Sequence, residues 1–131
     1  MSYGTQVTLD EPFGEAVERV RAALAAQGFG VLTEIDVTAT LKAKLGEQME
    51  DYVILGACNP PSAHRALGID RSIGMLLPCN VVVRAAAQGT MVEALDPQMM
   101  VTLTGRPELK PVADEVSRRL ATALAELSPQ V

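Results

Sequence analysis

The chain has 131 residues, of which 48% are hydrophobic and only 3% aromatic, and its formal net charge is −5. This length is enough for one well-packed core and too short for two ordinary domains, so we expect a single compact domain over residues 1–131. The negative charge and the scarcity of aromatic rings argue against nucleic acid as a partner, because phosphates need a basic surface and bases need rings for stacking.

The sequence shows no membrane signal. Residues 1–7 lack a basic region followed by an apolar stretch, and the apolar run over residues 73–83 is interrupted by Gly74, Pro78 and Asn80. We therefore expect no membrane partner and a cytoplasmic location.

The first half of the chain alternates between strand and helix patterns. Asp10 and Pro12 predict the start of a helix, in which apolar residues recur every three or four positions until Gly28. Asp36 is expected to cap a short helix that ends at Gly46. The predicted strands cover residues 3–9, 29–35 and 52–57, and the last of them is apolar enough to be buried on both faces.

The second half begins with a proline pair and ends with an amphipathic helix. Pro60 and Pro61 fit the first turn of a helix, where their missing N–H groups are not needed, and that short helix stops at Gly68. Gln88 and Gly89 predict a tight turn between two strands. The remaining predicted elements are an irregular segment at 69–77, strands at 80–86 and 90–95, a last short strand at 99–103 and a final helix at 109–127.

This order of elements predicts an α+β fold. We expect an antiparallel sheet with two long helices on one face, in the order β-α-β-β-β-β-α, with short helices in the connections. The strands are too apolar for a sheet with one wet face. A second copy of the chain is therefore the expected cover, which makes a homodimer.

Each of the two cysteines stands directly before an asparagine, in Cys58-Asn59 and in Cys79-Asn80, with proline close by. These runs predict two loop ends that frame one site. Cys58 precedes a helix N-terminus, where unpaired backbone donors and the helix dipole stabilise a thiolate. Such thiols can act as nucleophiles, redox sensors or soft-metal ligands. In the alternative reading, both cysteines are small buried apolar residues.

Five other side chains are candidates for a site, and one of them, Asn80, is expected first to hold a turn. His64 is the only histidine and is either a third metal ligand or solvated. Three ligands at most suit copper(I) better than a closed zinc site, which needs four. Asn59 and Asp36 are expected first as helix caps. Lys44 could contribute to a small basic rim that attracts an anion.

Two functions of different class stay open. The first is soft-metal binding, with copper as the candidate ion, or a redox response through Cys58 and Cys79, with help from His64. The second is a non-catalytic dimer with structural cysteines, in which the helix start after Cys58 and the Lys44 region bind an anionic or polar metabolite. No reaction is assigned, because the sequence offers no defensible acid and base pair.

Four blocks of the sequence, taken together and in order, look like the signature of a known family. The chain resembles the prokaryotic domain-of-unknown-function family 302 over nearly its whole length. The resemblance implies a small α+β fold of the TATA-binding-protein-like class, commonly as a homodimer, and brings no activity with it. The blocks are residues 29–36, 42–46, 52–60 and 76–81, and the positions that the family marks are Asp36, Lys44, Cys58, Asn59, Pro78, Cys79 and Asn80.

Overall fold

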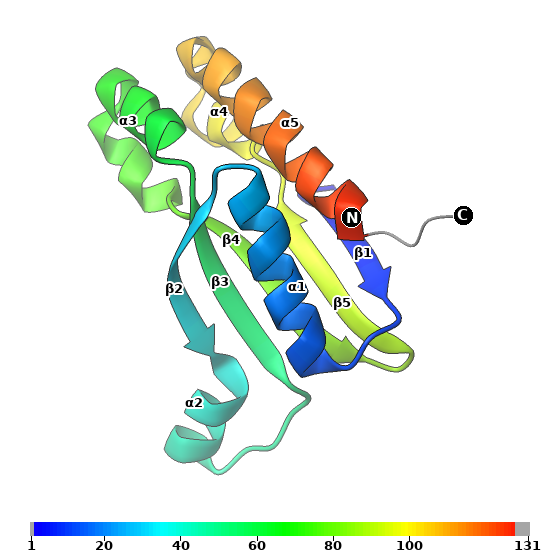
Figure 1. Ribbon diagram of the computed structural model, residues 1–131. Helices are drawn as coiled ribbons and strands as arrows, with labels where there is room; N and C mark the ends of the chain where they lie inside the picture. Colours follow the sequence, from blue (N-terminus) through cyan, green and yellow to red (C-terminus); the bar gives the residue numbers. More distant parts are fainter. Residues whose placement is uncertain (1, 128–131) are drawn as a thin grey trace.

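A computed structural model describes residues 2–127 of the chain. Its centre is a five-stranded sheet in which every neighbouring pair is antiparallel, in the spatial order β1-β5-β4-β3-β2 (Figure 1). The strands are β1 (Gly4–Leu9), β2 (Gly30–Asp36), β3 (Tyr52–Cys58), β4 (Cys79–Ala86) and β5 (Gly89–Leu95). The helices are α1 (Phe13–Ala26), α2 (Val37–Leu45), α3 (Pro60–Ile69), α4 (Met99–Thr104) and α5 (Lys110–Leu127), with short 3-10 helices at Arg71–Leu76 and Pro107–Leu109.

The two long helices, α1 and α5, pack against each other and against the same face of the sheet (Figure 1). Apolar residues on the strands alternate, so that one side of each strand enters the core beneath these helices, with Leu55, Val83 and Val92 fully buried. The predicted α+β class, with an antiparallel sheet and two long helices, is confirmed.

The start of the first long helix differs from its prediction. Pro12, rather than Asp10, occupies the N-cap position of α1, and no side chain caps this end. Proline needs no partner there because it has no N–H group. The helix is held instead by its buried apolar face, which includes Val17, Val20 and Leu24.

The prediction of a strand at residues 99–103 is wrong, because this segment forms the helix α4. The Asp96 side chain accepts a hydrogen bond from the Gln98 backbone N–H at 2.9 Å, and the Met99 N–H bonds to the Asp96 carbonyl. This turn winds the chain into a helix immediately after β5. Both edges of β5 are already paired, with β1 and β4, so a following strand has no place beside it.

Among residues 2–127, no helix layer covers the second face of the sheet, and this face exposes apolar side chains. Ile35 on β2 is 49% exposed, and its register partner Ile54 on β3 is half-buried. Leu32, at the β-bulge of β2, is 67% exposed. We call Leu32, Ile35 and Ile54 the β2 patch. Across residues 2–127, every helix is either too short or too polar to cross a lipid bilayer.

Candidate functional site

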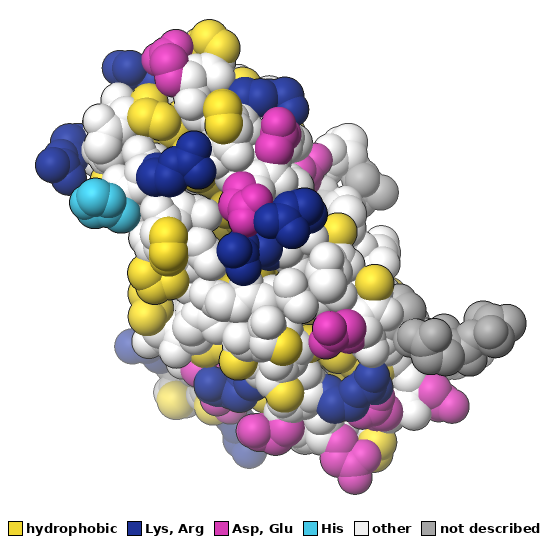
Figure 2. Space-filling view, turned by 45° about the horizontal axis from the view of Figure 1, so that its top comes forward, with side chains coloured by type: hydrophobic (Ala, Val, Ile, Leu, Met, Phe, Trp, Pro, Cys, Tyr) yellow, Lys and Arg dark blue, Asp and Glu magenta, His cyan; other side chains and the backbone are white. Residues whose placement is uncertain are grey.

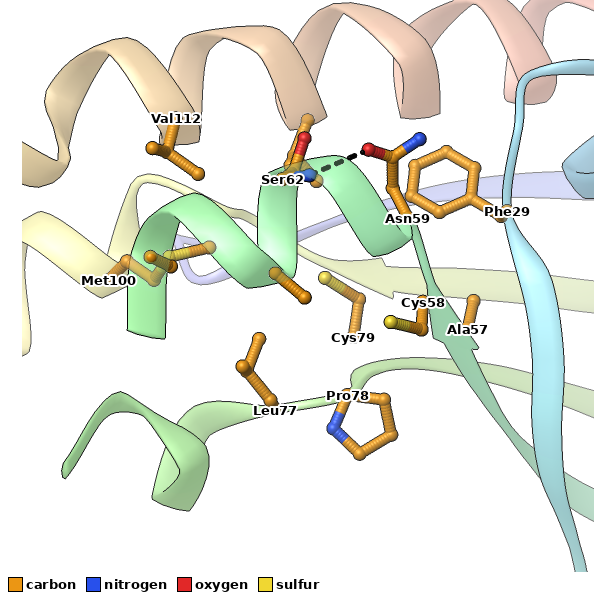
Figure 3. Close-up of a pocket in the computed structure, with 13 residues that line it drawn as sticks. Phe29, Ala57, Cys58, Asn59, Ser62, Leu77, Pro78, Cys79, Met100 and Val112 are labelled. Atoms are coloured by element: carbon orange, nitrogen blue, oxygen red, sulfur yellow. Dashed lines mark hydrogen bonds between the residues drawn. The ribbon is translucent and has the colours of Figure 1, made fainter. Parts of the chain in front are cut away.

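The two cysteines line the same small cavity at one end of the sheet. Cys58 is the last residue of β3 and Cys79 is the first residue of the neighbouring β4. The cavity has a volume of about 20 Å³, which is room for about one water molecule. It is lined mainly by apolar side chains from several strands, helices and loops (Figure 3), which include Phe29, Ala57, Leu77, Met100 and Val112.

The strand register explains how both thiols reach this cavity. Cys79 lies opposite Ala57, so the side chains of Cys79 and Cys58 leave the β3–β4 ladder on opposite faces. Because both residues stand where their strands end, the cavity wraps around the end of the sheet. In Figure 3 the sulfur of Cys58 lies on the side of its residue nearer Cys79. Both thiols are free, and their divergent directions disfavour a direct disulfide without backbone movement.

Cys79 holds its proton in neutral solution. Burial, with a smaller contribution from the charge of Cys58, raises the pKa of the Cys79 thiol to about 11. Since the thiolate is the nucleophile and the metal ligand, Cys79 alone is a poor nucleophile. A cation in the cavity would reverse this preference, because a coordinated thiol loses its proton.

Asn59, which lines the cavity, makes hydrogen bonds to α3 and to the turn that follows α1. Its side-chain oxygen accepts a hydrogen bond from the Ser62 backbone N–H at 3.1 Å, which caps α3 as predicted. Its side-chain NH₂ donates to the Gly28 carbonyl at 3.1 Å, in the turn that follows α1. Gly28 has φ +82°, and a Cβ there would lie 3.1 Å from the Asn59 amide nitrogen, so only glycine fits.

The start of α3 differs from the expected anion site, because its backbone donors are already used. Pro60 and Pro61 have no N–H group, the Ser62 N–H bonds to the Asn59 side chain, and the Ala63 N–H bonds to the Asn59 carbonyl. The unpaired donors expected beside Cys58 are therefore absent from this first turn. The dipole of the ten-residue helix remains, with its positive end at the cavity.

Asn59→Ala should lower the free energy of unfolding by about 2 kcal/mol, since it removes both the cap and the Gly28 hydrogen bond from a buried position. Asn59→Ser should cost about half as much, because serine can cap α3 but is too short to reach Gly28. Urea unfolding measures both. Asp36→Ala, which removes an exposed cap of α2, is the matched control and should cost at most about 1 kcal/mol. Equal costs for the serine and alanine variants would contradict the role of the Gly28 bond.

The structure brings together three of the predicted site residues, Cys58, Asn59 and Cys79. The other four lie outside the cavity. His64 is exposed on α3, and the histidine stands out from the surface in Figure 2. Asn80 is exposed on the face of β4 opposite the helices. Asp36 caps α2 through the Ala39 N–H at 2.9 Å and Lys44 lies in the last turn of α2, at the other end of β2 from the cavity (Figure 1).

These positions limit what the site can hold. Within residues 2–127, no group of three His, Cys, Asp or Glu side chains is arranged to bind a metal ion. A site at the cavity therefore has the two cysteine sulfurs as its thiolate ligands and lacks the expected help of His64. The anion site proposed for Lys44 and the start of α3 is not assembled either, since the two regions lie at opposite ends of β2.

The sequence analysis missed the residues that close the cavity. Met100 reaches it from α4, which the sequence predicted as a strand, and Val112 and Val116 reach it from α5. Val112 and Val116 lie in the predicted final helix at 109–127, but that prediction does not say which part of the core they reach. Besides Cys58, Asn59 and Cys79, Pro78 is the lining residue that the family resemblance had marked.

Comparisons with known proteins agree with this fold. A family model described as "Domain of unknown function DUF302" matches residues 5–127. The chain is also similar to a solved structure, "Crystal structure of uncharacterized conserved protein DUF302 from Bacillus stearothermophilus", with 32% sequence identity and a TM-score of 0.90. That similarity covers 97% of this chain and 99% of the other. No curated protein matches.

Proposed function

Since the chain belongs to the DUF302 family, whose description names no activity, we propose a function from the cavity itself: it binds one copper(I) ion through Cys58 and Cys79. The observation that supports this proposal is that both sulfurs line one cavity with no charged wall. Thiolates are soft ligands, which suit copper(I).

The size and chemistry of the cavity favour an ion over a metabolite. Its volume of about 20 Å³ is far below the several hundred Å³, about 300 Å³ or more, that small-molecule sites need. An anionic metabolite would also need free donors, and the first turn of α3 has none to give. Two sulfur ligands are too few for a structural zinc site, which uses four.

Binding exchanges protons for metal without oxidation. The S–H bonds of Cys58 and Cys79 break, two S–Cu bonds form, and two protons pass to solvent, while copper stays copper(I). The bound group then carries one net negative charge in an apolar cavity, which by itself is unfavourable. The positive end of the α3 dipole, directly after Cys58, offsets part of that cost.

Native mass spectrometry under anaerobic, reducing conditions tests this proposal. We expect one copper(I) ion per wild-type chain, and an affinity lower by at least about a hundredfold in Cys58→Ser and in Cys79→Ser, since each loses a ligand. His64→Ala is the matched control and should bind like wild type, because His64 lies outside the cavity. Absence of copper on the reduced wild-type protein, or full binding by both serine variants, rejects the proposal and leaves structural cysteines.

We also propose that a second copy of the chain covers the β2 patch. The support is the exposure of Ile35, which lies opposite Ile54 on the sheet face away from α1 and α5, together with the exposure of Leu32 at the neighbouring bulge. Sedimentation should show a wild-type dimer that Ile35→Asp converts to monomer, because a carboxylate cannot be buried there unpaired. Gln88→Asp adds the same charge at the exposed β4–β5 turn and should stay dimeric. A wild-type monomer at every concentration contradicts this proposal.

A further inference from the structure

A second concavity lies on the sheet face that α1 and α5 leave uncovered, and Asn80, which directly follows Cys79 on β4, is part of its lining. Its volume is about 240 Å³, and we call it the sheet hollow. Asn80 and Val82 alternate with the buried residues of β4, and Glu93 and Leu95 alternate with those of β5, which places all four on the uncovered face. Tyr3 and Tyr52 complete the side-chain lining of the hollow.

The charges in the sheet hollow are already balanced. Glu93 accepts a hydrogen bond from Arg84 Nε at 2.7 Å, and both side chains are partly buried. The carboxylate is thus neutralised by the protein's own cation, and the chain as a whole is negative. A charged ligand of either sign would have to compete with this ion pair, so the hollow favours a neutral one.

The polar side chains of the hollow that lack a hydrogen-bond partner indicate which polar groups a neutral ligand needs. Among residues 2–127, the Asn80 side chain and the hydroxyl groups of Tyr3 and Tyr52 make no hydrogen bond to another residue. An asparagine side chain presents one acceptor and two donors, which are complementary to another amide. Tyrosine rings, Val82 and Leu95 supply apolar surface on which a flat ring can stack.

We propose that the sheet hollow binds a neutral, single-ring molecule that carries an amide or lactam edge, with Asn80 as the polar anchor. The hollow is smaller than sites for drug-sized ligands, which limits the occupant to about one ring. The β2 patch borders the sheet hollow on the same face, because Ile54 lies opposite Val82 in the strand register.

The aromatic residues of the chain make this site easy to observe. The sequence has two tyrosines, two phenylalanines and no tryptophan, and both tyrosines line the sheet hollow. Phe29 is buried at the thiol cavity instead. Proton NMR of the tyrosine rings therefore reports on the hollow, and the Phe29 ring serves as an internal control.

The probe is benzamide, with benzoate as its charged match. We expect benzamide to shift the tyrosine ring resonances until they saturate, with a dissociation constant of about 1 mM. The ring resonances of Phe29 should not shift. Benzoate should bind at least about tenfold more weakly because it brings a charge to a balanced site. Equal shifts with benzamide and benzoate, or shifts that do not saturate, overturn the proposal without the need for any variant.

Two variants locate the binding and separate it from the thiol site. Asn80→Leu should weaken benzamide binding at least about tenfold, whereas Gln6→Leu, an amide on the same face that does not line the hollow, should not. Undiminished binding by Asn80→Leu overturns the role of the anchor. A protein with both cysteines replaced by serine should bind benzamide like wild type, so failure of the copper proposal leaves this result unchanged.

Discussion

Between pH 9 and pH 11 the free energy of unfolding should fall by about 2 kcal/mol more in the wild type than in Cys79→Ala. The ordinary pKa of this thiol is 9.0 and the folded protein raises it to about 11. In that window the unfolded chain has lost the proton and the folded chain still holds it, so the folded state binds more protons and stability decreases as pH rises. The effect is fully developed above pH 11 and absent well below pH 9. Urea unfolding of the metal-free protein at several pH values measures it.

Cys58→Ala is the informative control for this pH dependence. Burial is the larger cause of the raised pKa of Cys79 and the charge of Cys58 is the smaller one. The Cys58→Ala protein should therefore keep most of the extra loss of stability, while Cys79→Ala loses it entirely. Apart from the two cysteines, every ionisable group is present in all three proteins, so the contribution of these other groups cancels. If the free energy of unfolding of wild type and of Cys79→Ala changed with pH in parallel, the folded protein would not raise the pKa of the Cys79 thiol.

The parts of the fold that the sequence predicted correctly are those with a clear apolar period. Val17, Val20 and Leu24 recur at helical spacing, and α1 follows it. The continuous apolar run of residues 52–57 became the buried centre of β3. Residues 99–103 are apolar but too short to show a period, so the Asp96 turn that winds them into α4 decided their structure.

For the site, the sequence predicted that Cys58 and Cys79 lie near each other, but it did not predict which residues surround them. Placing Cys58 and Cys79 at neighbouring strand ends follows from strand lengths and an antiparallel order. The absence of free donors at α3 could also have been inferred, because Pro60 and Pro61 lack N–H groups. The burial of Cys79 could not have been inferred from the sequence. Part of the cavity wall comes from α4 and α5, and no local sequence pattern specifies how these helices pack.

Copper(I) affinity should rise by at least about a thousandfold between pH 6 and pH 9. The raised pKa of Cys79, about 11, means that its thiol is protonated throughout this range. Binding must displace that proton, which makes the apparent affinity about tenfold tighter for each pH unit. Any proton that Cys58 also releases on binding steepens the dependence. Competition against a copper(I) chelator whose own pH dependence is known measures this slope.

The same slope separates a two-thiolate site from adventitious binding at one cysteine. If Cys58 alone held the ion, the proton on Cys79 would stay in place and would not enter the equilibrium. Cys79→Ala should then behave like wild type, with the same affinity and the same slope. In a two-thiolate site the variant instead binds far more weakly and loses a factor of about ten per pH unit from its pH dependence. An affinity for the wild type that does not change with pH would exclude Cys79 as a ligand, and with it the shared cavity as a copper site.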